Sequence, residues 1–171
     1  MIYFVLNFVT FQILWFSNVL GSGGYDWMWA GIVGAIPLVV LTFWSEFRQN
    51  DVLLALTCVG GGFVMDTLWI QLGILDLGST VAPLWICTLW FGLGLTINHS
   101  LKWFRDQRVL GPIVVGAFGP VTYFTGQSLG AATILEPTLL PLISITWAAF
   151  FYLLTVLANY PHQTKAVTSS S

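Results

Sequence analysis

Six apolar segments, each about as long as a bilayer is thick, constrain the fold of this chain more than any other feature. A helix rises about 1.5 Å per residue, so about 20 apolar residues cross a hydrocarbon core of about 30 Å. Only helices and closed barrels satisfy their backbone in lipid, and these segments are too long and uniformly apolar for barrel strands. We therefore predict an all-α integral membrane protein, a bundle of six transmembrane helices at residues 3–20, 27–45, 52–71, 81–101, 109–128 and 138–158.

The scarcity of charge leads to the same conclusion and limits the partners. Charged residues make up 7% of the chain, against about 25% in a soluble domain. The lipid bilayer is therefore the expected main partner. No basic patch with interleaved aromatic residues is present, so nucleic acid is not expected. We predict no metal and no cofactor, because no His/Cys/Asp cluster has ligand spacing and no phosphate- or dinucleotide-binding motif occurs.

The connections between the apolar segments are short, which leaves no room for a water-soluble domain. We predict a single transmembrane domain over residues 1–160, followed by a polar, disordered tail at residues 161–171. The first segment lacks a basic start and contains Asn7 and Gln12. It is therefore expected to be a retained span rather than a cleaved signal peptide.

The basic residues predict an orientation. With six spans, all five fall on one side of the membrane: Arg48, Lys102, Arg105, Arg108 and Lys165. The opposite side carries only acids, which are Asp26, Asp76 and Glu136. The positive-inside rule then places both termini of this multi-pass membrane protein in the cytoplasm.

Polar residues inside the spans are predicted to form two layers. The inner, cytoplasmic layer can hold Asn7, Asn98, His99 and Ser100, and the outer layer can hold Asn18, Asp66, Gln71, Tyr123 and Gln127, with Gln12 near the middle of the membrane. Asp66 and His99 are then about 15–20 Å apart along the membrane normal. Because a catalytic carboxylate and imidazole must lie within about 3 Å of each other, an Asp66–His99 dyad is disfavoured.

Each of the two ionisable residues in these layers has two interpretations. Asp66 is either a proton, cation or ligand-anchoring site or a hydrogen-bonded carboxyl that ties spans together. His99 is either an acid/base or headgroup ligand, assisted by Asn98 and Lys102, or an ordinary residue at a helix end. The cationic side chains of Lys102, Arg105 and Arg108 are expected to contact lipid headgroups or a partner protein.

Three segments carry a family resemblance. Residues 6–21 (LNFVTFQILWFSNVLG), 82–104 (APLWICTLWFGLGLTINHSLKWF) and 116–131 (GAFGPVTYFTGQSLGA) resemble a family of small bacterial inner-membrane proteins known only as a domain of unknown function. The combination LNF..FQ..WF, AP.W...LW.....NHS..W and GP..Y..G..LGA is fairly specific. The resemblance implies no established activity and no site residues.

Three functions remain open on the sequence. The two polar layers in an apolar, glycine-rich bundle favour a membrane-embedded binding or transport module for a lipid-like or small amphipathic molecule. The first alternative is a lipid-modifying enzyme, or a subunit of one, at the cytoplasmic interface with His99 as its candidate catalytic residue. The second is a membrane scaffold that holds a soluble partner through residues 102–108. A homo-oligomer or a membrane-protein partner is compatible with each.

Overall fold

The computed structural model describes residues 2–22 and 28–159, and this part of the chain is mostly helical. The long helices are α1 (Ile2–Leu20), α2 (Met28–Phe43), α3 (Arg48–Gln71), α4 (Leu84–Gly94), α6 (Leu110–Ser128) and α7 (Leu140–Ala158). Shorter elements are α5 (Lys102–Asp106), the 3-10 turn η2 (Pro137–Leu139) and the strands β1 (Leu75–Asp76) and β2 (Thr133–Ile134). The all-α prediction is confirmed apart from this two-stranded ribbon.

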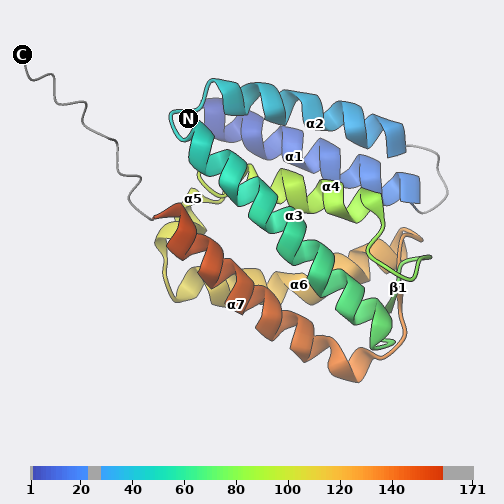
Figure 1. The fold of residues 1–171 in the computed structure, drawn as a ribbon. Helices are drawn as coiled ribbons and strands as arrows, with labels where there is room; N and C mark the ends of the chain where they lie inside the picture. The colour runs from blue at the N-terminus through green and yellow to red at the C-terminus, as the bar shows by residue number, and fades with distance from the viewer. Residues whose placement is uncertain (1, 23–27, 160–171) are drawn as a thin grey trace, which may run out of the picture.

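The helices pack in pairs along a common direction. α1 lies along α2 and also contacts α4, α3 lies against α4 and α7, and α6 lies along α7 (Figure 1). α1 and α6, by contrast, share no substantial packing. Side chains of both helices face the space between them, and the cavity described below lies there.

Three helical segments of the described chain are long and apolar enough to cross a membrane: Ile2–Leu20, Arg48–Gln71 and Pro137–Ala158. Large apolar side chains are exposed on their outer faces, such as Phe4, Leu56 and Ile145, which are 49%, 63% and 64% exposed. In water such surfaces would be costly. These properties indicate a membrane protein.

The fourth apolar segment, residues 81–101, is not the single continuous helix that was predicted. α4 ends at Gly94 after 11 residues, and residues 95–101 continue as a series of turns up to α5. Gly94 lies directly on the backbone of α3, where an added Cβ would overlap Ala55. The Thr96 hydroxyl donates to the Leu93 carbonyl at 2.6 Å and helps to turn the chain. The break leaves backbone groups that need partners from other helices.

Four predicted connections are also more ordered than expected. β1 and β2 pair antiparallel, with Leu75 opposite Ile134, and so join the segments predicted as loops at residues 72–80 and 129–137. Residues 102–108 include the short helix α5. The segment predicted as a loop at 46–51 already contains the first turn of α3, so Asp51 is a helical residue. The predicted disordered tail at 161–171 lies outside the described residues.

Glycine permits the close contact of α6 with α7. A Cβ on Gly116 would lie 2.6 Å from the Ser144 carbonyl oxygen and 2.8 Å from the Ala148 Cβ. Small residues allow this approach in lipid, where the hydrophobic effect does not drive helix association. The helices α6 and α7 are thus closely packed against each other.

Candidate functional site

A buried contact between a carboxyl group and an imidazole forms where α3 begins and α4 has ended. Oδ2 of Asp51 lies 3.0 Å from Nε2 of His99, and the side chains of Asp51 and His99 are 0% and 8% exposed. Ser45 donates to the same carboxylate oxygen at 2.7 Å. The His99 ring packs against Tyr3, with ring centroids 4.9 Å apart, and against Phe47. The turn between α2 and α3, the start of α3 and the broken part of the fourth segment therefore meet here.

Asn98 links Asp51 to a buried arginine. Its Nδ2 donates to Oδ1 of Asp51 and Oδ1 of Asn50, each at 2.7 Å, and its Oδ1 accepts from Nη1 of Arg105 at 2.6 Å. The guanidinium also contacts Oδ1 of Asp106 through Nε and Nη2. All these groups have partners, which buried polar groups require. We call this set the inner cluster: Ser45, Asn50, Asp51, Asn98, His99 and Arg105.

Asn7 of α1 satisfies the backbone that the break in the fourth segment exposes. Its Oδ1 accepts from the Ser100 hydroxyl at 2.7 Å and from the Ser100 backbone N–H at 3.3 Å. Its Nδ2 donates to the Leu95 carbonyl at 3.1 Å. One buried amide of the first helix therefore holds both ends of the irregular segment. The structure places Asn7, Asn98, His99 and Ser100 together, at the same end of the bundle.

Asp66 forms a separate site on α3. It lies 15 residues beyond Asp51, which is about 22 Å of helix. Its Oδ2 accepts from the indole Nε1 of Trp90 at 2.6 Å, and its Oδ1 accepts from the Tyr123 hydroxyl. The carboxyl is fully buried. Asp66 therefore links α3 to α4 and α6. Its carboxyl oxygens are bonded to Trp90 and Tyr123, and it does not pair with His99, as the depths expected from the sequence indicated.

The other residues assigned to the outer layer do not join Asp66. Asn18 is buried and donates to the Leu14 carbonyl of its own helix at 2.9 Å. Gln71 donates to the Thr80 carbonyl, and Gln127 accepts from the backbone N–H of Ile134 at 2.7 Å. Each fixes local backbone, so only Asp66 and Tyr123 of this set form a cluster.

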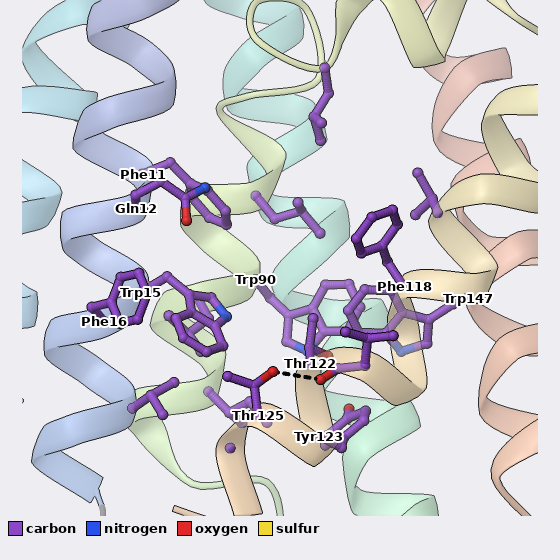
Figure 2. Close-up of a pocket in the computed structure, with 18 of the residues that line it drawn as sticks. Phe11, Gln12, Trp15, Phe16, Trp90, Phe118, Thr122, Tyr123, Thr125 and Trp147 are labelled. Atoms are coloured by element: carbon purple, nitrogen blue, oxygen red, sulfur yellow. Dashed lines mark hydrogen bonds between the residues drawn. The ribbon is translucent and has the colours of Figure 1, made fainter. Parts of the chain in front are cut away.

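A cavity of about 450 Å³ lies between α1 and α6, with α4 behind it. α1 contributes side chains at helical spacing, namely Phe8, Phe11, Gln12, Trp15, Phe16 and Val19. α6 faces them with Val114, Val115, Phe118, Val121, Thr122 and Thr125, and α4 supplies Trp85, Ile86, Leu89, Trp90 and Leu93. Figure 2 shows Phe11, Trp15 and Phe16 across from Phe118 and Trp147, with Trp90 between the two groups.

The cavity opens to the side of the bundle. Phe8, Phe16 and Phe118 line it and are 48%, 48% and 56% exposed, whereas Ile86 and Trp90 at its back are 6% and 4% exposed. From Phe8 to Val19 the α1 wall extends over about 16 Å. The cavity is therefore an elongated groove whose mouth lies in the gap between α1 and α6.

Hydrogen bonds turn most polar groups of the wall away from the cavity. Trp90 and Tyr123 donate to Asp66, while the hydroxyls of Thr122 and Thr125 donate to the carbonyls of Gly119 and Val121 in their own helix. Two groups differ: none of the described residues hydrogen-bonds the side chain of Gln12, and the buried indole N–H of Trp147 has no hydrogen-bond partner among them. Asp66 thus accepts the hydrogen bonds of Trp90 and Tyr123 behind the apolar lining of the cavity.

The inner cluster lacks the arrangement of a serine–histidine–aspartate relay. In such a relay the aspartate and the serine contact opposite nitrogens of the ring. Here both approach Nε2, Asp51 at 3.0 Å and Ser45 at 3.3 Å. A carboxylate only accepts hydrogen bonds, so Nε2 carries a hydrogen towards Asp51. No group of three or more His, Cys, Asp or Glu residues in the described chain could hold a metal ion.

Sequence reasoning missed both Asp51 and Trp90. Asp51 was placed in a loop, although an Asn-Asp pair directly before an apolar span is a signal for a polar helix start. Arg105 also departs from the expectation of a headgroup contact, because it is 7% exposed and bonded to Asn98. Lys102 and Arg108 are exposed, as a headgroup or partner contact requires.

Three long apolar helices, outward apolar faces and buried polar contacts between helices define a helical protein of membrane type. Within this class the chain belongs to the family described as "Protein of unknown function (DUF2878)", whose model matches residues 4–153. The resemblance to an uncharacterised domain family is thus confirmed. Neither the curated proteins nor the solved structures contain a match to the chain.

Proposed function

We propose that the protein is a membrane-embedded binding module for a lipid-like molecule, which it holds in the groove between α1 and α6. The observation that carries the proposal is the apolar, aromatic-lined cavity of about 450 Å³ with an open side. Ligand sites are commonly concave, mostly apolar and about 300–1,000 Å³ in volume. In a bilayer the mouth of this groove faces the acyl chains, so a lipid reaches the cavity without crossing water.

The proposal includes the full topology of six spans with both termini in the cytoplasm of a bacterial cell, in the inner membrane. The beginning of α3 at Arg48, the short helix α5 and the start of α6 lie at the end of the bundle where α1 begins and α7 ends (Figure 1). That end carries Arg48, Lys102, Arg105 and Arg108, which supports a cytoplasmic assignment under the positive-inside rule. The ribbon with Asp76 lies at the opposite end.

Photo-cross-linking tests the proposal. A phospholipid with a diazirine in its acyl chain is incorporated with the protein into vesicles, illuminated, and the adducts are mapped by peptide mass spectrometry. We expect adducts on Ile86 and Trp90, which are buried at the back of the groove and shielded from bulk lipid. The variant Val115→Trp, which fills the groove, is expected to lose them. Adducts confined to outward residues such as Leu56 and Ile145 would contradict the proposal.

A lipid-modifying enzyme, or a subunit of one, is the second candidate, and the Asp51–His99 contact is the observation that favours it. A buried imidazole held by a carboxylate is a common acid/base arrangement. The residues that line the cavity do not include Asp51, His99 or Ser45, so this cavity does not bring substrate to the pair. Lipid analysis of cells that carry His99→Ala tests the candidate. An altered lipid profile supports it, and an unchanged profile opposes it.

A scaffold function through residues 102–108 has less support. Within this segment the exposed cationic side chains are those of Lys102 and Arg108, whereas Arg105 is buried and bonded to Asn98. Loss of a soluble partner on changing both exposed residues to glutamine would favour this function over the binding module.

A further inference from the structure

The wall of the groove is free of charge. In the described chain none of the side chains that line the cavity is charged, and its few polar groups are those of Gln12, Tyr123, two threonines and the tryptophan indole N–H groups. An ionised headgroup in such a place would lose its hydration without a cationic partner, which is strongly unfavourable. The carboxyl of Asp66 lies behind Trp90 and Tyr123 and accepts hydrogen bonds from both, so it offers an anion no favourable partner.

Aromatic rings make up much of the same wall. Phe11, Trp15, Trp90, Phe118 and Trp147 surround the cavity (Figure 2). Aromatic side chains favour stacked or edge-to-face contacts with other flat π systems beyond the area that they bury. This lining suits a ring or a conjugated chain better than a disordered saturated chain.

Gln12 supplies the polar contact. It lies near the middle of α1 in the lining of the groove, and no described residue hydrogen-bonds it, whereas both threonines of the wall are bonded to backbone carbonyls. Its amide can donate to a carbonyl and can donate to or accept from a hydroxyl. A ligand oxygen within reach of this amide would satisfy both groups.

We propose that the groove selects an uncharged lipid that carries a flat ring or conjugated chain and a carbonyl or hydroxyl oxygen, which Gln12 binds. This selectivity rests on the proposed lipid-binding function and names the chemical class of its ligand. Ionised fatty acids and phosphate-bearing headgroups are rejected because the uncharged wall offers them no cationic partner.

Quenching of tryptophan fluorescence measures the selectivity, because Trp15, Trp90 and Trp147 line the groove. The purified full-length protein in detergent is titrated with decylubiquinone, and hexadecanol and palmitate compete for the site at about pH 9, where the fatty acid is ionised. We expect saturable quenching, and displacement by hexadecanol at a concentration at least about tenfold lower than that of palmitate. Gln12→Leu should weaken decylubiquinone binding by about 3- to 10-fold, as loss of one hydrogen bond implies.

Two controls separate local from general effects. Gln49→Leu changes an exposed glutamine at the start of α3 and should leave binding unchanged. Val115→Trp should abolish saturable quenching. Equal or tighter binding of palmitate, or no effect of Gln12→Leu, would overturn the proposed selectivity while leaving lipid binding intact. If no probe binds saturably, the selectivity is overturned, and the photo-cross-linking above then decides separately whether the groove holds any lipid.

Discussion

Oδ2 of Asp51 lies 3.0 Å from Nε2 of His99, and this contact exists because the fourth apolar segment stops being a helix at Gly94. Had α4 continued to residue 101, as its apolar length suggested, the Asn98–Ser100 segment would have followed the helical periodicity. Instead the turns of residues 95–101 direct Asn98 and His99 towards the start of α3 and Ser100 towards α1. Broken helices in membrane proteins are tolerated where the freed backbone is buried within protein.

Asp51→Asn is expected to destabilise the fold. The change removes the charge that Ser45, Asn98 and His99 all contact in a site with 0% exposure. Loss of buried, charge-assisted hydrogen bonds costs about 1–3 kcal/mol, so the thermal unfolding midpoint in detergent should fall by about 3–10 °C. Glu46→Gln, an exposed acid in the neighbouring turn, is the control and should shift the midpoint by less than about 2 °C. Equal midpoints for the two variants would contradict the role given to Asp51.

Asn7→Ala is expected to loosen the irregular segment. Its side chain makes three hydrogen bonds to Leu95 and Ser100, and their loss leaves a carbonyl and an N–H buried without partners. We expect a loss of about 2 kcal/mol or more and faster hydrogen exchange at residues 95–101, measured by mass spectrometry. Thr10→Ala, one turn along the same helix with bonds only to Leu6 and Asn7, should leave this exchange rate unchanged. Unaltered exchange in Asn7→Ala would exclude a bracing role.

Asp66 and Tyr123 should be energetically coupled. Tyr123→Phe removes the donor and Asp66→Asn replaces the carboxyl that accepts from it. The double variant should therefore be more stable than the sum of the single effects predicts, by about 0.5–3 kcal/mol. The measurement is a double-mutant cycle of unfolding free energies in detergent. Additive effects would show that the hydrogen bond contributes nothing, and the idea that Asp66 organises the cavity wall would then fail.

Two helical glycines should respond in opposite ways to the same change. An alanine at position 94 would overlap the Ala55 backbone, whereas a Cβ at Gly60 meets nothing within 4 Å. We expect Gly94→Ala to destabilise the protein by about 1–3 kcal/mol, and Gly60→Ala to be neutral or stabilising by up to about 1 kcal/mol, because alanine favours helices. Thermal unfolding of both variants checks the contrast, and a stable Gly94→Ala variant would contradict the close packing of α3 and α4.

The sequence predicted most helices well, because long apolar runs have few alternatives in lipid. It also predicted that Asn7, Asn98, His99 and Ser100 lie at the same depth in the membrane. It could not predict the break after Gly94, since this depends on the contact of that glycine with α3 and on acceptors supplied by α1. For the same reason Asp51 was not paired with His99.

The cavity was beyond sequence reasoning as well. Its walls come from side chains at helical spacing on α1 and α6, and such spacing equally predicts two helices that touch. Only the arrangement in space shows that they stand apart. Trp90 illustrates the difficulty, because a tryptophan inside an apolar run gives no signal that its indole N–H bonds to Asp66.

Native mass spectrometry of the protein released from its own membranes tests the lipid-binding groove most directly. The wild-type chain is expected to retain a bound lipid, and so is Val64→Trp, which adds an indole at a 55% exposed position on α3 away from the groove. Val115→Trp, which fills the groove, is expected to carry none. Loss of the bound mass from all three proteins, or its retention by Val115→Trp, would contradict a lipid site between α1 and α6.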